Sequence, residues 1–205
     1  MNYLYYLLTI VPSIVLHEVS HGWVANYYGD PTAKQQGRLT LNPLKHIDPF
    51  GTVLLPALLI FSGLPIFGYA KPVPVNVSRL RNPRKQSLYV SIAGPLVNIL
   101  LSAIGFVVCK YGLRVNNELI INISASFGIA NLTLAAFNLI PIPPLDGSAI
   151  IERFIPLRNL GKYFEFRNKA LPFLMVLIIA DAMFLHIGTG FLGGLRNWWI
   201  SLVLN

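Results

Sequence analysis

Several long apolar tracts constrain the folds that are open to this chain. Tracts of about 20 residues are long enough to cross a bilayer as helices, and they lie at residues 2–28, 88–109, 119–140 and 171–187. Of the 205 residues, 54% are hydrophobic and only 12% are charged, which is about half the charged share of a soluble domain. We therefore expect an all-α membrane protein, a polytopic transmembrane helix bundle of about four to six membrane segments.

The region between the first two tracts departs from this pattern. Residues 50–68 are apolar but interrupted by glycine and proline, so they favour either a poor span or a segment that dips into the membrane and returns. Residues 37–43 have the pattern of a short strand and turn, and the alternating residues 69–76, which contain prolines, predict an extended edge strand. The sequence thus predicts a short β or re-entrant element before the 88–109 span.

The net charge of +8 is concentrated in two loops. Thirteen of the 16 lysines and arginines lie there, eight between residues 30 and 87 and five between 153 and 169. Under the positive-inside rule, both loops are cytoplasmic if 50–68 re-enters, with the N-terminus and the 110–118 hairpin outside. If 50–68 crosses instead, the basic stretch 71–85 lies outside, which the rule disfavours. Membrane topology therefore explains the charge better than a nucleic-acid partner does.

The first tract carries the motif Leu16-His17-Glu18-Val19-Ser20-His21. On a helix its two histidines lie ~40° apart around the axis and ~6 Å apart along it, so they face the same way. Two such histidines suit a metal with nitrogen ligands and tetrahedral geometry, usually zinc. Glu18 is placed to act as a general base toward a water at that metal. The competing interpretation is a polar helix face packed inside the bundle, although three ionisable residues so close together in lipid are costly.

A proline-rich break after the 119–140 tract supplies a candidate third ligand. The segment Pro141-Ile142-Pro143-Pro144-Leu145-Asp146-Gly147 cannot continue a regular helix. Unwound backbone at membrane depth is tolerated only where protein or a water-filled cavity surrounds it. In the preferred topology the break lies on the same side as the histidines, so Asp146 can provide the protein ligand that two imidazoles leave missing. Otherwise Asp146 caps the helix that follows.

In combination and order, three motifs resemble the site-2 protease family of intramembrane zinc metalloproteases. They are His-Glu-x-x-His in an apolar helix, Gly94-Pro-Leu-Val-Asn98 in a middle span, and Asn138-Leu-Ile-Pro-Ile-Pro-Pro-Leu-Asp146-Gly147 after a later span. The resemblance covers at least residues 1–150. It implies one integral-membrane metalloprotease domain over 1–205, with its core at 1–150 and C-terminal spans or interfacial helices at 151–205. The chain is similar to the compact branch of the family, because no soluble stretch in it could hold a PDZ or CBS domain.

The resemblance also implies an activity. The expected reaction is hydrolysis of a peptide bond within or near the cytoplasmic end of a substrate's transmembrane helix, as in regulated intramembrane proteolysis. His17, His21 and Asp146 would bind one zinc ion per chain, and Glu18 would be the base and proton shuttle. The expected partners are a transmembrane protein or peptide and the lipid bilayer. The expected location is the cell membrane, with a multi-pass chain whose active site faces the cytoplasm.

Two asparagines and the predicted edge strand each have two interpretations. Asn98 and Asn138 would hold the substrate backbone or the oxyanion, or they bridge helices by hydrogen bonds. An edge strand binds an extended, unwound peptide through backbone hydrogen bonds, or it is an ordinary surface strand. The strand residues proposed for substrate binding are Pro72, Val73, Pro74 and Val75.

The remaining ionisable residues carry weaker predictions. His46 and Asp48 lie in a loop and favour a solvated turn over a role near the zinc motif. Asp181 and His186 lie in the last tract, where snorkelling to the interface or mutual pairing is favoured over a role of their own.

A second class of function remains open at this point. The chain could be a non-catalytic membrane zinc-binding protein, such as a carrier, a sensor or a retired protease that acts as a scaffold. A carrier is usually built from paired repeats, and the sequence shows no internal duplication. The presence of Glu18 argues against a retired protease.

Overall fold

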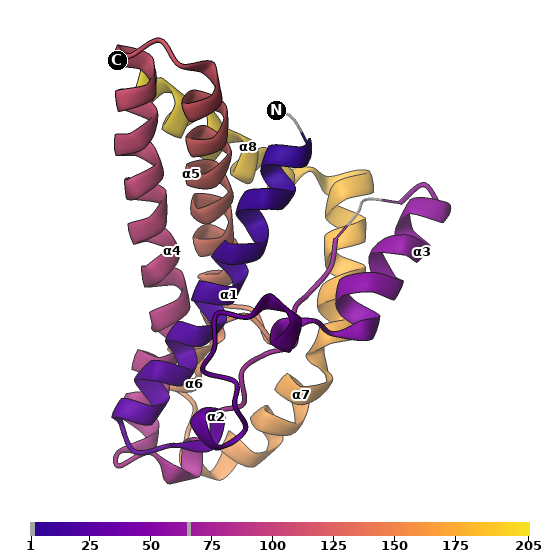
Figure 1. The fold of residues 1–205 in the computed structure, drawn as a ribbon. Coiled ribbons are helices and arrows are strands. Elements are labelled where there is room, and N and C mark those ends of the chain that lie inside the picture. Colours follow the sequence, from indigo (N-terminus) through magenta and orange to yellow (C-terminus); the bar gives the residue numbers. More distant parts are fainter. Residues whose placement is uncertain (1–2, 65–66) are drawn as a thin grey trace.

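The computed structural model describes residues 3–64 and 67–205, which fold mainly into helices (Figure 1). Three long helices pack against one another: α1 (Tyr3–Tyr27), α4 (Pro83–Arg114) and α5 (Glu118–Asn138). α7 (Leu157–Ala180) and α3 (Leu55–Phe61) stand to one side, on the right in Figure 1. The short elements are α2 (Thr32–Gln35), η1 (Pro43–His46), η2 (Pro49–Leu54), η3 (Val77–Arg79), α6 (Ser148–Glu152) and η4 (Asp181–Leu185).

Small residues allow the last helix, α8 (Ile187–Leu204), to pack on the bundle. A Cβ atom added to Gly105 of α4 would lie 2.7 Å from the Cα atom of Gly128 in α5, so these two backbones are in direct contact. Gly128 also meets the ring of Trp199 in α8. The C-terminal segment, for which the sequence predicts a span or an interfacial helix, therefore forms a helix that packs in one cluster with Cys109 and Ile129.

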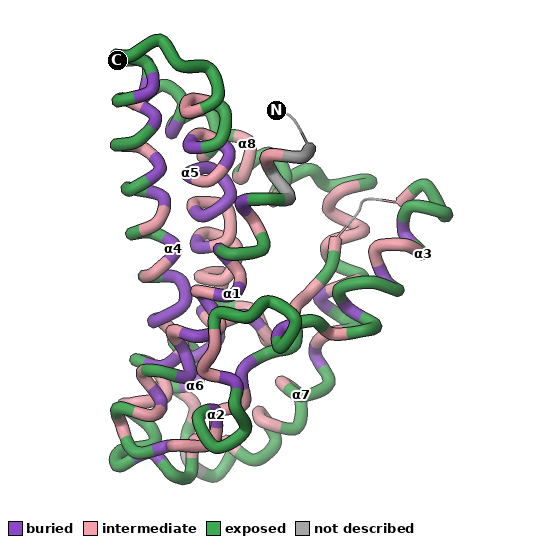
Figure 2. The backbone as a smooth tube through the Cα atoms, viewed as in Figure 1, coloured by how far each residue is buried: buried purple, intermediate pink, exposed green. Residues whose placement is uncertain are grey.

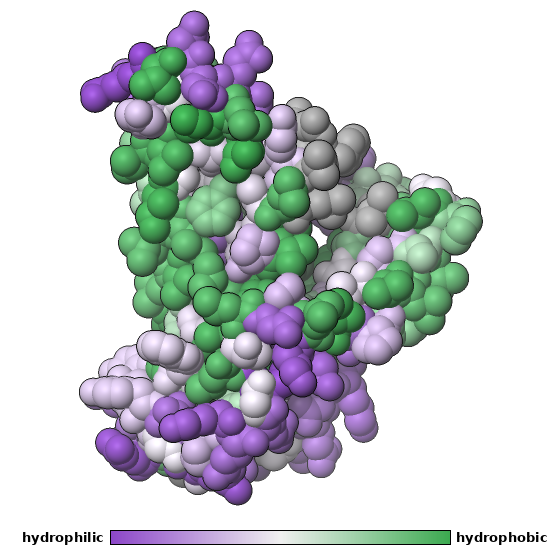
Figure 3. Space-filling model, in the orientation of Figure 1, coloured by the Kyte–Doolittle hydropathy of each residue, from purple (hydrophilic) through white to green (hydrophobic). Residues whose placement is uncertain are grey.

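An apolar band separates two polar ends on the face of the molecule drawn in Figure 3. Among the described residues, three helices are long and apolar enough to cross a membrane: Pro83–Arg114, Glu118–Asn138 and Arg158–Leu185. They overlap three of the four predicted apolar tracts, although the last begins 13 residues before the predicted 171–187, and the chain is therefore an integral membrane protein. The predicted total of four to six segments is not confirmed, and α1 stays a predicted span.

The predicted β element is wrong, because no strand forms within residues 3–64 and 67–205. Residues 69–76 are extended but have no partner strand. Pro72 and Pro74 lack the N–H group that a ladder needs. The N–H groups of Val73 and Asn76 donate instead to side-chain carboxylates that lie far away in the sequence. These side chains replace the partner strand.

The described residues of the apolar excursion over 50–68 contain a short helix rather than a long one. η2 runs directly into α3, and together they are about 20 Å long at 1.5 Å per residue, against about 30 Å for the hydrocarbon core. Its two ends meet, because the N–H of Lys71 donates to the carbonyl of His46 (2.9 Å) and that of Tyr69 to the carbonyl of Gly51 (3.1 Å). The chain therefore enters and leaves this excursion at neighbouring positions in the structure.

Polar side chains occupy much of the centre of the bundle. Buried residues follow the faces of α1, α4 and α5 that are turned toward one another (Figure 2). The largest fully buried side chains include Asn98, Asn131 and Ser13, which come from α4, α5 and α1. Burying a polar group is costly unless it is hydrogen-bonded, so this centre is built around specific polar contacts.

Candidate metal centre

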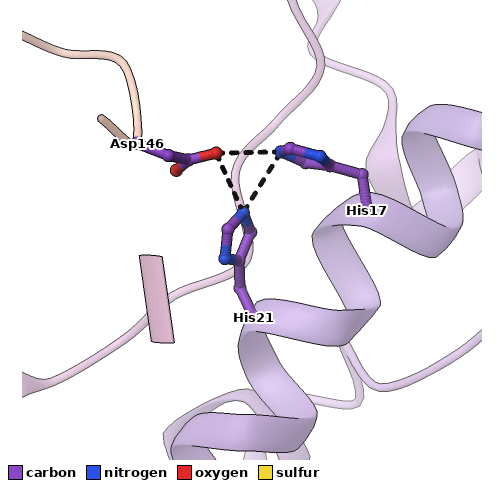
Figure 4. A group of neighbouring side chains, drawn as sticks. All are labelled: His17, His21 and Asp146. Carbon is purple, nitrogen blue, oxygen red and sulfur yellow. Dashed lines mark hydrogen bonds and ion pairs between the residues drawn. The ribbon is translucent and has the colours of Figure 1, made fainter. Parts of the chain in front are cut away.

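Three side chains from two distant parts of the chain converge beside α1 (Figure 4). Within α1, the spacing of His17 and His21 puts both imidazoles on one face, with their Nε2 atoms 3.2 Å apart. The Oδ2 atom of Asp146 lies 3.1 Å from Nε2 of His17 and 3.4 Å from Nε2 of His21. These three residues form the one group of potential metal ligands in the described part of the chain. The predicted ligand set is thus brought together.

The proline break holds Asp146 in this position. After α5 ends, the N–H of Gly147 donates to the carbonyl of Asn138 (2.7 Å), which folds the break back against the end of the helix. No side chain caps the N-terminus of α6. The competing interpretation, in which Asp146 caps the next helix, is therefore not observed.

The geometry of the three ligand atoms fits a metal ion. Tetrahedral bonds of about 2.0–2.1 Å keep ligand atoms about 3.3 Å apart, and the observed separations are 3.1, 3.2 and 3.4 Å. Oδ2 of Asp146 is buried and makes no hydrogen bond of regular geometry. Each imidazole uses Nδ1 for a hydrogen bond elsewhere, so both Nε2 atoms present lone pairs. Three atoms that present lone pairs to one another repel unless a cation lies between them. Two imidazoles with one carboxylate are a ligand set that suits zinc.

Both imidazoles are oriented from α4. Nδ1 of His21 donates to the backbone carbonyl of Val90 (2.7 Å), and Nδ1 of His17 lies 2.5 Å from Oδ1 of Asn98. Such partners fix the tautomer and the ring orientation of metal-binding histidines. A Cβ atom on Gly94 would lie only 2.5 Å from each ring. The Gly-Pro-Leu-Val-Asn motif therefore supplies space through Gly94 and a hydrogen bond through Asn98.

Glu18 lies beside this group and is held by the extended segment that follows α3. Its Oε2 atom accepts a hydrogen bond from the N–H of Val73 (2.8 Å). The segment is anchored by Arg38, which donates to the carbonyl of Lys71 (2.9 Å), and by the fully buried Asp30, which accepts from the N–H of Asn76 (2.6 Å). No motif in the sequence marks Asp30 as this anchor, because its partner Asn76 lies 46 positions away.

Two cavities meet at the candidate centre. The apolar cavity, about 260 Å³, lies among α1, α5, α7 and residues 67–70. The second cavity, about 520 Å³, has a more polar lining than the first and is called the polar cavity; it contains all three ligand residues and extends to Ser87, Ser91 and Arg167. The residues that line both are His17, Glu18, Asn138, Pro144 and Leu145. The candidate centre therefore lies where an apolar space joins a polar one.

Only some of the residues proposed for substrate binding line these two cavities. Asn138 lines both cavities, and its Nδ2 atom donates to the carbonyl of Leu134 (3.0 Å). Asn98 is completely buried and lines neither of them. Of the predicted edge strand, Pro72, Val73 and Val75 line the polar cavity, whereas Pro74 does not.

An ion pair borders the polar cavity. Nη1 of Arg167 lies 3.1 Å from Oε2 of Glu152. Burial raises the pKa of Glu152, although the charge and hydrogen bond of Arg167 act in the opposite direction. This pair links α6 to α7 beside the segment that carries Asp146.

One prediction for a peripheral residue is wrong, and for another pair one of the two predicted alternatives is not observed. His46 is buried rather than solvated, with Nε2 at 2.9 Å from the carbonyl of Thr40, because the loop folds over it. Asp181 does not pair with the side chain of His186. Its carboxylate accepts the first N–H groups of α8, from Ile187, Gly188 and Thr189, and so caps that helix.

Comparison with known proteins identifies the family of this chain. The model of peptidase family M50 matches residues 5–116 and 112–180, so the chain belongs to this family, the site-2 proteases. Among its relatives is the "Putative zinc metalloprotease YwhC" of Bacillus subtilis, 44% identical over 159 residues, which are 74% of this chain and 69% of the relative. No solved structure matches the chain significantly.

More distant relatives are matched over smaller shares of their length. The "Putative zinc metalloprotease Rip2" of Mycolicibacterium smegmatis is 31% identical over 140 residues, 68% of this chain and 53% of the relative. The "Zinc metalloprotease MJ0392" of Methanocaldococcus jannaschii is 28% identical over 144 residues, 70% of this chain and 32% of the relative.

Proposed function

We propose that this protein is a zinc-dependent intramembrane endopeptidase that hydrolyses a peptide bond within or near the cytoplasmic end of a substrate's transmembrane helix. The observation that carries the proposal is the convergence of His17, His21 and Asp146, with ligand atoms 3.1–3.4 Å apart, beside Glu18 at the junction of two cavities. Membership of peptidase family M50 and the names of the relatives support it.

Each residue of the centre has a role in this proposal. His17, His21 and Asp146 hold one zinc ion, which when bound acts as a Lewis acid and lowers the pKa of a water molecule. Glu18 accepts a proton from the attacking water and passes it to the leaving amine. The hydrogen bond from the N–H of Val73 fixes one oxygen of Glu18 and so orients its carboxylate.

The two cavities suit a substrate that changes polarity along its length. The apolar cavity among α1, α5 and α7 accepts residues of a transmembrane helix, and the polar cavity accepts its unwound, more polar end. Asn138 lines both and is placed to bind the substrate backbone between them. The extended residues Pro72, Val73 and Val75 form one wall of the polar cavity.

The proposed topology places the centre toward the cytoplasm of a multi-pass protein in the cell membrane. The two ends of the 50–68 excursion meet, which supports re-entrance, and the basic loops then lie at one end of the bundle. Single cysteines at Lys71 and Arg84 should be labelled by an impermeant reagent only from inside. Labelling from outside would contradict this topology.

The test is a comparison of wild type with Glu18→Gln, both purified into lipid nanodiscs. Glu18→Gln should keep its zinc, because Glu18 is not a ligand, yet cleave a model transmembrane substrate on the order of 10²–10⁴-fold more slowly, the usual contribution of a general base. Glu118→Gln, in the first turn of α5 at the opposite end of the bundle, is the matched control and should cleave normally. Unchanged cleavage by Glu18→Gln would exclude Glu18 as the general base and overturn the proposed mechanism. A wild type that binds zinc but leaves the substrate intact would favour a non-catalytic zinc protein.

A further inference from the structure

A line of buried polar side chains leads away from His17 into the bundle, and the proposed chemistry makes no use of it. Oδ1 of Asn98 lies 2.5 Å from Nδ1 of His17, and Nδ2 of Asn98 donates to Oδ1 of Asn131 (2.7 Å). Nδ2 of Asn131 then donates to Oγ of Ser13 (2.8 Å). Asn98, Asn131 and Ser13 each have 0% of their surface exposed. The line joins α4 to α5 and returns to α1.

The donor and the acceptor of each hydrogen bond in this line are determined by two backbone carbonyls at the end farthest from His17, those of Phe127 and Thr9. Nδ2 of Asn131 also donates to the backbone carbonyl of Phe127 (2.9 Å), and a carbonyl can only accept. The amide of Asn131 must therefore turn its NH₂ group toward Phe127 and its oxygen toward Asn98. Ser13 donates its own hydrogen to the carbonyl of Thr9 (2.7 Å), so its oxygen is left to accept from Asn131. A reversed Asn131 would place oxygen against oxygen at Phe127.

The orientation of the Asn131 amide in turn fixes the orientation of the Asn98 amide and the tautomer of His17. Since Asn131 offers an oxygen, Asn98 must turn its NH₂ group toward Asn131 and its own oxygen toward His17. His17 then carries its hydrogen on Nδ1 and a lone pair on Nε2, the atom that faces Asp146 and His21. A reversed Asn98 would offer NH₂ to Nδ1 and favour the tautomer with hydrogen on Nε2, which cannot bind a metal.

The two histidines thus reach the same tautomer by different means. His21 donates to the backbone carbonyl of Val90, which has only one way to bond. His17 faces a side-chain amide, which can present either of its two ends. An amide at this position needs a second group to hold its orientation, and Asn131 is that group.

We propose that Asn131 and Ser13 are positioning residues, which hold Asn98 in the orientation that directs the Nε2 lone pair of His17 to the metal. They act through Asn98 and touch neither metal nor substrate. The inference rests on the zinc site of the proposed function. Outer partners of this kind are typically worth about 10–100-fold in metal affinity.

The test measures zinc affinity by competition with a chromophoric chelator, in nanodiscs without substrate. Asn131→Leu should weaken zinc binding about 10–100-fold. Ser13→Ala should weaken it about 2–10-fold, because Phe127 still holds Asn131 and one neutral hydrogen bond is lost. The matched control is Ser124→Ala, since Ser124 is also buried and also donates to a carbonyl four residues earlier but has no part in the line. It should bind zinc like the wild type.

Two further readouts separate positioning from simple packing. The melting temperature of the metal-free protein should fall in both Ser13→Ala and Ser124→Ala, whereas the visible spectrum of bound Co²⁺ should change only in Ser13→Ala and Asn131→Leu. If Asn131→Leu does not fold, the two serine variants decide. Wild-type zinc affinity in Ser13→Ala, or an equal loss in Ser124→Ala, would overturn the inference while leaving the zinc site intact. Failure of the wild type itself to bind zinc would refute the proposed function.

Discussion

At Gly94, α4 packs directly against the rings of His17 and His21. Gly94→Ala therefore tests whether this close packing maintains the geometry of the candidate centre. The added Cβ atom would lie 2.5 Å from Cε1 of His17, 2.5 Å from Nε2 of His21 and 2.7 Å from Nε2 of His17. Heavy atoms in contact normally lie about 3.5–4.0 Å apart. Both rings, or α4 itself, must therefore move by about 1 Å.

The size of the effect follows from what such a movement breaks. A displacement of about 1 Å is half the length of a zinc–nitrogen bond of about 2.0–2.1 Å. It also strains the hydrogen bonds of the two rings to Asn98 and Val90, each worth about 0.5–1.5 kcal/mol. We expect Gly94→Ala to lose at least about 100-fold in zinc affinity and to lower the free energy of unfolding by about 1–3 kcal/mol through overpacking.

The assay is zinc affinity measured beside thermal unfolding of the metal-free protein. Gly105→Ala is the first control, because its Cβ atom would press on the backbone of Gly128 at 2.7 Å rather than on the histidines. It should lower stability without changing the zinc affinity of the folded protein. Gly193→Ala has no atom within 4 Å of the new Cβ and should change neither. Wild-type zinc affinity in Gly94→Ala would refute the proposed packing of α4 against the two rings.

Three other predictions concern the ligands, the extended segment and the metal. Asp146→Asn should lose most zinc binding and all cleavage, as measured by metal content and a substrate assay; retention of one zinc per chain would exclude Asp146 as a ligand. Asp30→Asn should cost about 1–3 kcal/mol, because the buried acceptor of the Asn76 N–H is weakened, and hydrogen exchange should quicken at residues 71–76; unchanged protection there would contradict the anchoring role. Chelator treatment should abolish cleavage, and zinc added at 100 times its Kd should restore it and stabilise the protein by about 2.7 kcal/mol; cleavage that survives complete zinc removal would count against the metal.

The helices and the chemistry of the centre could be predicted because their signals are local. Apolar tracts mark helices directly, and the i, i+4 spacing places His17 and His21 on one face without reference to the rest of the fold. Asp146 could be predicted because prolines force a break beside it and the preferred topology puts that break on the same side as the histidines. For the helices and the two histidines, a few neighbouring residues contain the physical reason.

The remaining features depend on contacts between distant segments. The alternation in residues 69–76 predicts a strand, but the N–H of Val73 finds its acceptor in Glu18, 55 positions earlier. The space required at Gly94 exists only once α4 lies against α1. In the sequence, Asn131 is one polar residue in an apolar helix, and its role follows only from its hydrogen bonds with Asn98 and Ser13. A polar side chain at the same depth in each of α1, α4 and α5 is a signal that could have pointed to this line.

The most direct test of the central claim is a titration of zinc into the metal-depleted protein, followed by cleavage of a membrane-embedded model substrate. If His17, His21 and Asp146 form a catalytic zinc site, cleavage will be absent without zinc, rise in proportion to the zinc added and stop rising at one zinc per chain. Cleavage by the zinc-free protein, or a lack of cleavage in the fully loaded wild type against a substrate that other family M50 peptidases cut, would contradict the account.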